Sequence, residues 1–160
     1  MNAPAKGVKP GMLELDIHSA PSPAPGSERQ SRAQAQVMCL LNQTWGTTVA
    51  TNVLVADTPA KRRRGLLGRP PLTLEQGIWI VPCESVHTFG MGYSIDLVYL
   101  NRRRRVVKIV EALAPNRVSF CLRARSVIEL ASGTVRRSGT QVGHQMALAA
   151  SPESVSATSD

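Results

Sequence analysis

The stretch that decides the fold is SIDLVYLNRRRRVVKIVEAL, residues 94–113. Two runs of aliphatic and β-branched side chains, residues 94–100 and 106–113, flank the polar segment NRRRR. Runs of this kind are typical of β-strands, and a short polar connection between two of them is typical of a hairpin. We therefore predict an antiparallel β-hairpin whose connection is residues 101–105.

Shorter apolar runs lie on both sides of this hairpin. Residues 48–57 alternate β-branched and other side chains, which is the period of a strand. Residues 78–81 form an apolar run too short for a helix, and residues 126–130 form another that stops before Gly133. The pattern predicts a mainly β fold, a single compact sandwich-like or barrel-like domain of about six or seven short strands. The remaining strands are expected at residues 37–42 and within residues 134–148.

The clearest helix pattern is DTPAKRRRGLLG, residues 57–68. Asp57 or Thr58 can accept hydrogen bonds from the free N–H groups of a first turn, and Pro59 suits the first helical position. Gly68 can adopt the left-handed conformation that ends a helix. We predict one short helix at about residues 58–67.

The 160-residue chain is long enough for one domain with a modest core. Residues 1–35 are rich in Pro, Ser, Ala and Gln, with too few apolar side chains to offset the entropy cost of ordering. We predict a disordered or low-complexity tail at 1–35, a single β domain at 36–149 and a second tail at 150–160.

The charge and the cysteine content restrict the possible partners and the cellular compartment. Nineteen Lys and Arg against eleven Asp and Glu give a net charge of +8, which attracts polyanions. Three cysteines cannot form a complete set of intrachain disulfides, which favours a reducing compartment. No stretch reaches the about 18 apolar residues of a membrane span, and no secretory signal is recognisable. We predict a cytoplasmic protein that does not associate with a membrane.

The main candidate site is VPCESVHTFGM, residues 81–91. Cys83, His87 and Met91 share a side whether the segment is extended or helical. With Cys121 or Asp96 they could hold a metal, or His87 could activate the Cys83 thiol. The structural alternative, which we favour, is that both cysteines are small buried hydrophobic residues and that His87 is a hydrogen-bonded core or rim residue.

Asp96 and Glu129 are acids inside apolar strand patterns. If either faces a pocket, burial would raise its pKa and make it a candidate general acid or base. The structural alternative is a partner Arg or Thr hydroxyl, and we favour it.

The four arginines at the hairpin tip could contact phosphates without reading sequence. Nucleic-acid surfaces usually carry aromatic side chains for base stacking, however, and we expect the core to need most of the chain's two Trp, two Tyr and two Phe. We therefore favour solvated charge for Arg102, Arg103, Arg104 and Arg105. No phosphate-binding loop, nucleophile elbow or His-Glu-x-x-His motif is present.

An ordered series of motifs resembles the domain of unknown function 192 family over about residues 38–148: ADTPAKRRRGLLGR, QGIWIVPCESVHTFGM, IDLVYLNRRRRVVKIV, SVIELASG and TQVGHQM. The resemblance implies one compact, mainly β domain of bacterial or archaeal distribution, with no established activity and no catalytic residues. The sequence differs from the family pattern at the NRRRR turn, at Ala131 and Ser132, at His144, and at Gly90 and Gly92 on either side of Met91. The matching positions are Gly65, Leu66, Leu67, Cys83, His87, Thr88, Met91, Ile95, Asp96, Glu129 and Gly133.

Taken together, the sequence predicts a non-catalytic β domain without cofactor or metal that binds a small molecule or a protein around residues 83–96. The candidate ligand-binding residues are Cys83, His87, Thr88, Met91, Asp96, Cys121 and Glu129. Two alternatives stay open. One is a metal- or thiol-dependent enzyme using Cys83, His87 and Cys121, and the other is nucleic-acid binding through Arg102, Arg103, Arg104 and Arg105.

Overall fold

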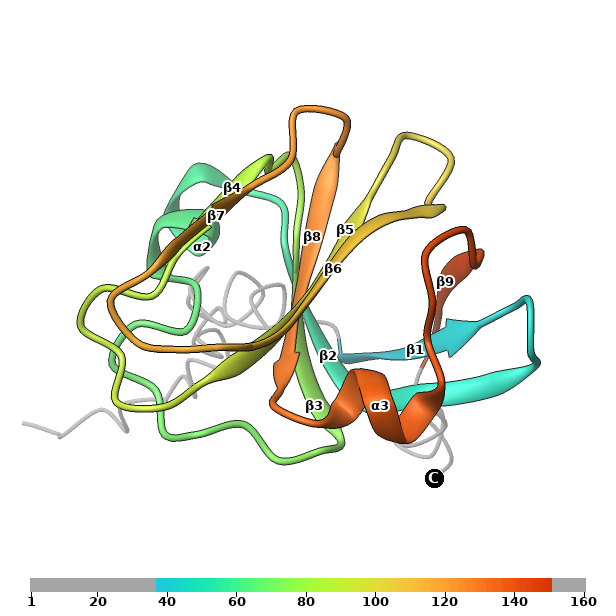
Figure 1. The fold of residues 1–160 in the computed structure, drawn as a ribbon, viewed down its shortest axis with the longest axis horizontal. Helices are drawn as coiled ribbons and strands as arrows, with labels where there is room; N and C mark the ends of the chain where they lie inside the picture. The colour runs from blue at the N-terminus through green and yellow to red at the C-terminus, as the bar shows by residue number, and fades with distance from the viewer. Residues whose placement is uncertain (1–36, 151–160) are drawn as a thin grey trace, which may run out of the picture. The chain divides into compact units, whose positions relative to one another are not determined.

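The computed structural model describes residues 37–150, so the predicted tails lie outside the described residues, apart from Ala150, which ends a strand. The described chain contains nine strands and two short helices (Figure 1), and the mainly β fold class is confirmed. Neither helix is long and apolar enough to cross a membrane. In chain order the elements are β1 (Val37–Asn42), β2 (Thr47–Ala56), α2 (Pro59–Arg64), β3 (Gln76–Ile80), β4 (Ser85–His87), β5 (Ile95–Leu100), β6 (Val106–Leu113), β7 (Val118–Phe120), β8 (Ser126–Ala131), α3 (Thr134–Ser138) and β9 (Met146–Ala150).

Seven of the strands form one mixed sheet in the order β6-β5-β8-β3-β2-β1-β9, and β4 pairs with β7 in a separate two-stranded sheet. The β2–β3 pair is parallel, and the other pairs of these two sheets are antiparallel. The edge strands β6 and β9 approach each other at one end, where Arg105 bridges to Gln145 and the Val106 N–H donates to the His144 carbonyl over 2.9 Å. The contact does not extend along the strands, so the sheet curls without closing into a barrel.

The predicted hairpin is present as β5 and β6, and its turn depends on one side chain. The Asn101 Oδ1 accepts hydrogen bonds from the backbone N–H groups of Arg103 and Arg105, at 2.9 and 3.0 Å. Asparagine commonly organises turns in this way. The guanidinium groups of the four arginines take no part in this network, and all four residues are exposed.

The central strands β5 and β8 are buried along their whole length because both faces of the sheet are covered there. One face packs on the cluster that includes Leu40, Val98 and Ile128, on the side of β1, β9 and α3. The other face packs on the cluster that includes Leu97 and Tyr99, which Leu66 after α2 and Val86 of β4 cover. In Figure 1, α2, β4 and β7 lie on one side of β5 and β8, and β1, β9 and α3 lie on the other.

The helix boundaries differ in detail from the prediction. Thr58 caps α2 by accepting from the Lys61 N–H over 3.3 Å, and Pro59 is its first residue, as expected. The helix ends at Gly65, whose N–H bonds to the Lys61 carbonyl, rather than at Gly68. The structure adds α3 and the three-residue strands β4 and β7, which the sequence pattern does not reveal because they are so short.

Candidate functional site

A cleft of about 490 Å³ opens between α2 and the segment that runs from Pro82 to Met91. This volume lies within the range of small-molecule pockets, about 300–1,000 Å³. Four of the predicted site residues line the cleft, and three arginines of α2 form the opposite wall. The lining residues that carry its chemistry are Arg62, Arg63, Arg64, Cys83, His87, Met91 and Glu129.

Glu129 supplies a buried acid to the cleft. It pairs with Ile78 of β3 and Leu97 of β5, so its side chain lies on the sheet face that α2 and β4 cover. Only 5% of the residue is exposed, and its Oε2 has no hydrogen-bond partner among the described residues. Burial raises the pKa of the Glu129 carboxyl to about 7. Near neutral pH this group can therefore either donate or accept a hydrogen bond.

Cys83 lies on the wall of the same cleft, half-buried, and its thiol donates to the Ser85 carbonyl over 3.1 Å. Burial raises the pKa of this thiol, and the nearby charge of Glu129 raises it further. A raised pKa keeps the thiol protonated at neutral pH, whereas a nucleophilic cysteine needs a lowered one. Cys83 therefore contributes a protonated, polarizable side chain to the wall of the cleft.

His87 and Met91 complete this wall. His87 is exposed on β4, and its ring stacks on that of Phe89 with the centroids 5.4 Å apart. Met91 is half-buried, and its backbone N–H donates to the Thr88 carbonyl over 3.2 Å. The wall thus combines an imidazole, a thioether and a thiol.

The α2 wall is positively charged. Arg62 is fixed in place because its Nη1 donates to the Asp57 carbonyl over 2.8 Å and to the Val81 carbonyl over 3.4 Å. Arg63 and Arg64 are exposed, and neither forms an ion pair in the described part of the chain. These arginines are not among the site residues predicted from the sequence. Their position next to the Gly65–Leu67 family motif is the signal that could have indicated them.

Asp96 does not reach the cleft. It pairs with Leu130, one position along from Glu129, and so lies on the opposite face of the sheet. Its Oδ1 accepts from the Ala112 N–H over 2.9 Å, and its Oδ2 accepts from the N–H groups of Gly133 and Val135, each over 3.0 Å. Asp96 is therefore a hydrogen-bonded structural acid and does not face a pocket. Its partners are backbone N–H groups instead of the expected Arg or Thr hydroxyl.

Thr88 and Cys121 also lie away from the cleft lining. The Thr88 hydroxyl is fully buried and donates to the Ala114 carbonyl over 2.7 Å while accepting from the Arg117 N–H over 2.9 Å. Cys121 packs in the apolar cluster beneath β4. Residues 37–150 contain no group of three or more His, Cys, Asp or Glu placed to hold a metal ion.

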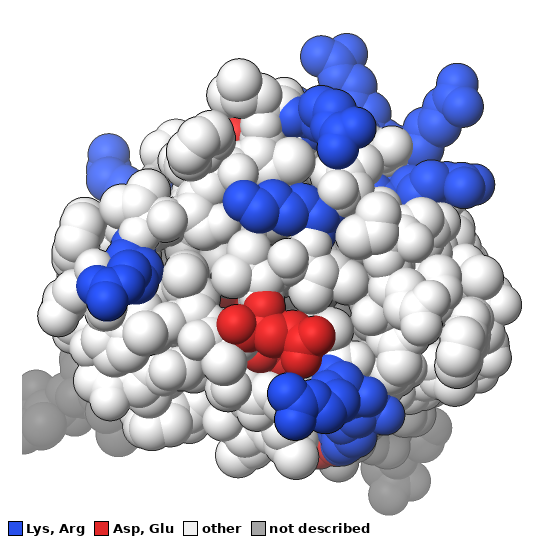
Figure 2. Space-filling model, in the orientation of Figure 1, with Lys and Arg blue, Asp and Glu red and all other residues white. Residues whose placement is uncertain are grey.

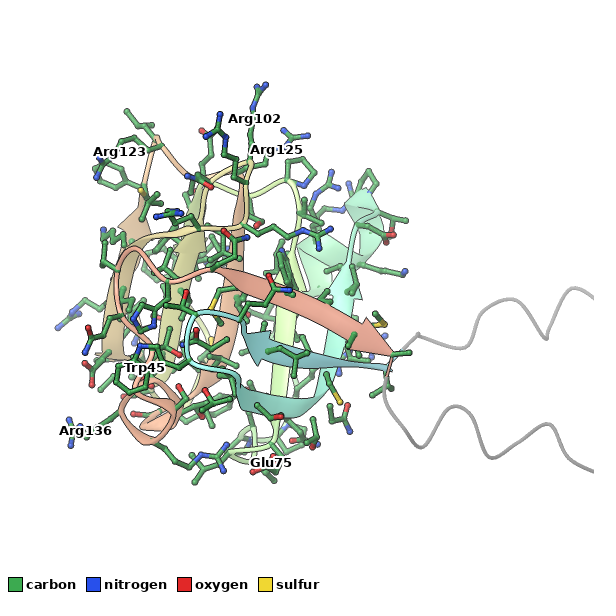
Figure 3. All side chains as sticks on the ribbon, turned by 90° about the vertical axis from the view of Figure 1, so that its right-hand side faces the viewer. Trp45, Glu75, Arg102, Arg123, Arg125 and Arg136 are labelled. Carbon is green, nitrogen blue, oxygen red and sulfur yellow. The ribbon has the colours of Figure 1, made fainter. Side chains whose placement is uncertain are left out.

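The hairpin-tip arginines lie at one end of the described domain, outside the cleft lining. Figure 2 shows blue side chains gathered over the turn between β5 and β6 at the upper right of the view. Figure 3 shows Arg102 at the same end as Arg123 and Arg125, with Glu75 and Arg136 at the opposite end. Arg104 lies over the Trp79 ring, 5.7 Å from its centroid.

Comparison with known proteins adds a family and a fold. The model of the DUF192 family, described as "Uncharacterized ACR, COG1430", matches residues 40–148. A UPF0127 protein of Pyrococcus furiosus is 31% identical over 113 residues, which are 67% of this chain and 95% of that protein. A UPF0127 protein of Thermococcus sibiricus is 37% identical over 78 residues, which are 46% of this chain and 50% of that protein.

The solved structure of a proposed transcription regulator from Sinorhizobium meliloti superposes with a TM-score of 0.62 at 20% sequence identity. The match covers 72% of this chain and 94% of that protein. At this level of identity the likeness concerns the fold alone.

Proposed function

The chain belongs to the DUF192 family of uncharacterised proteins, and from that premise we propose that its domain binds a small molecule in the cleft between α2 and β4. The observation that carries the proposal is the Glu129 carboxyl, which is buried at the cleft and whose Oε2 has no partner within residues 37–150. A buried polar atom without a partner costs about 1–3 kcal/mol, so a ligand group that pairs with it gains that amount.

The chemistry of the walls favours a ligand with an anionic group at one end. Arg63 and Arg64 have no ion-pair partner among the described residues, and guanidinium groups bind carboxylates and phosphates well. Glu129, at the other side of the cleft, suits a neutral hydroxyl, amide or ring nitrogen. Met91 and Cys83, which also line the cleft, offer soft apolar contact.

The metal- or thiol-dependent enzyme receives less support from the site. Cys121, which that alternative requires, packs outside the cleft lining, and the raised pKa of Cys83 disfavours its thiolate. We also propose a cytoplasmic location, because all three cysteines, Cys39, Cys83 and Cys121, are free.

The proposal can be tested with a panel of small carboxylates and phosphate esters, each added to the full chain while its melting temperature is followed. We expect at least one compound to raise the melting temperature and to slow the alkylation of Cys83 by iodoacetamide. Both effects should fall in Glu129→Gln and in Arg64→Ser, but not in Glu111→Gln, which changes an exposed acid outside the cleft. If no compound acts, or if Glu129→Gln leaves the effects unchanged, the cleft is not the binding site.

A further inference from the structure

The aromatic residues are distributed differently from the sequence expectation. We expected the core to need most of them, but three of the six are exposed: Trp45, Phe89 and Phe120. Both phenylalanines of the chain are thus on the surface, with 52% of Phe89 and 63% of Phe120 exposed. Aromatic side chains are therefore available on the surface for base stacking, contrary to the expectation from the sequence.

The two phenylalanines are brought to the same small sheet by the β4–β7 pairing. Ser85 pairs with Phe120, and His87 pairs with Val118. Val86 and Ser119 between them are buried, so the alternating partners point outward. Phe89 stacks on His87 and extends this surface beyond β4. We name the outward surface made by His87, Phe89, Val118, Phe120 and Leu122 the β4–β7 face.

The β4–β7 face is apolar at its centre and positively charged around its rim. Leu122, at the turn after β7, is 79% exposed. The Lys108 Nζ donates to the Phe120 carbonyl over 2.9 Å and lies 5.8 Å from the centre of its ring. Six exposed arginines of the segments 101–105 and 117–125 can contribute to this rim, and none has an ion pair in the described range: Arg102, Arg103, Arg105, Arg117, Arg123 and Arg125. Arg104 instead lies over the Trp79 ring, on the other face of the sheet.

The rim is continuous with the hairpin tip that the sequence analysis singled out. The Arg125 N–H donates to the Leu100 carbonyl over 2.7 Å, which brings the β7–β8 turn beside the β5–β6 turn. Figure 3 shows the side chains of Arg102, Arg123 and Arg125 projecting from this one end. Glu84 is the single acid in the segments 82–91, 101–105 and 117–125.

From this arrangement we propose that the β4–β7 face and its arginine rim bind single-stranded nucleic acid. Unpaired bases stack on exposed aromatic rings, while arginines neutralise the phosphates that connect them. A duplex keeps its bases stacked on one another and cannot use Phe120 or Phe89 in this way. Stacking on phenylalanine and contacts to phosphates carry little sequence information, so the binding is sequence-tolerant.

This surface is separate from the proposed small-molecule site, because Phe120 and Arg123 do not line the cleft. His87 lies at the border of both and is therefore left unchanged in the test. Failure of one proposal would leave the other standing.

The test is fluorescence anisotropy with a labelled oligothymidylate of about 20 nucleotides, titrated with the full chain at about 50 mM and about 200 mM salt. We expect binding that weakens as salt rises. Phe120→Ala should weaken it about fivefold or more, since stacking contributes about 1–3 kcal/mol per base. Phe120→Tyr, which keeps an aromatic ring, should retain most of the affinity. Arg123→Ser combined with Arg125→Ser should weaken binding and flatten its dependence on salt.

The matched charge control is Arg136→Ser, because the Arg136 side chain is 85% exposed at the opposite end of the domain. It should change the affinity little. The proposal is overturned by absence of binding at the lower salt, by equal affinity of Phe120→Ala and the unchanged chain, or by tighter binding of a duplex of the same length. Binding to vesicles of phosphatidylserine and phosphatidylcholine that is tighter than binding to the oligonucleotide, and that Phe120→Ala abolishes, would assign the face to a membrane surface instead.

Discussion

Asp96 and Glu129 are two buried acids on neighbouring central strands, and their surroundings differ in every other respect. Asp96 faces α3, and backbone N–H groups engage both of its oxygens. Glu129 faces the cleft beside α2, and its Oε2 has no partner among the described residues. Burial alone therefore does not distinguish a structural acid from a candidate binding residue. The two kinds of acid differ in how many carboxylate oxygens have hydrogen-bond partners and in whether an oxygen without a partner faces a cleft.

The largest effect should come from removing the satisfied acid. Asp96→Ala removes the acceptor of three backbone N–H groups, of which that of Val135 is buried and those of Ala112 and Gly133 are partly buried, and each such loss costs about 1–3 kcal/mol. We expect the free energy of unfolding, measured by urea titration, to fall by about 4 kcal/mol. Glu111→Gln changes an exposed acid and is the control. If Asp96→Ala lowers the free energy of unfolding no more than Glu111→Gln does, the hydrogen bonds of Asp96 do not stabilise the fold.

The second effect concerns Glu129 and pH. Because its carboxyl has a pKa of about 7 in the folded chain and about 4.5 when unfolded, the unfolded chain loses this proton first as pH rises. The free energy of unfolding therefore falls between pH 4.5 and pH 7, by about 3 kcal/mol in total, and stays low above pH 7.

Glu129→Gln cannot lose this proton, so its stability should not show that decline. The measurement is the difference in the free energy of unfolding between variant and parent at about pH 5 and about pH 8. The difference should shift in favour of the variant at the higher pH. A constant difference would mean that Glu129 is charged and solvated in the folded chain.

Thr88 tests whether removing a hydrogen-bonded buried hydroxyl also lowers the free energy of unfolding, by less than removing the Asp96 carboxylate does. Thr88→Val keeps the shape but removes both the donor to Ala114 and the acceptor for Arg117. The expected loss is about 1–3 kcal/mol in urea unfolding. Thr88→Ser, which keeps the hydroxyl, should lose less than Thr88→Val, and the reverse order would contradict the role given to the hydroxyl.

The smallest effect on stability should come from the cleft wall. Cys83→Ser retains a donor for the Ser85 carbonyl at a half-exposed position, so we expect a change below about 1 kcal/mol. Any compound that binds the cleft should nevertheless bind the variant differently, because a hydroxyl is less polarizable than a thiol. A large loss of stability would indicate that Cys83 belongs to the core.

Much of the fold was predictable because several of its elements have clear short-range patterns in the sequence. The β5–β6 hairpin and the cap and proline of α2 follow from short-range patterns. The helix α3 does not, because it has no side-chain cap of its own and Asp96, distant in the chain, accepts from its first turn. A contact between residues so far apart leaves no periodic trace in the sequence.

The site was predictable only in part for a related reason. The sequence showed that Cys83, His87 and Met91 share a side and that Asp96 and Glu129 lie within strands. It could not show that pairing places the two acids on opposite faces, because that depends on the register of β5 against β8. That register places Glu129 on the face of the cleft, which Cys83 and the arginines of α2 also line, and Asp96 on the other face.

The meeting of β6 and β9 at Arg105 and Gln145 has a consequence for self-association. Open sheet edges expose backbone groups that can recruit a strand from another molecule and start aggregation. Here the Met146 N–H donates to the Arg104 carbonyl and the Gly143 N–H donates to the Val106 carbonyl, so each edge occupies the other at this end. The chain thereby protects the most arginine-rich end of its sheet from intermolecular strand pairing.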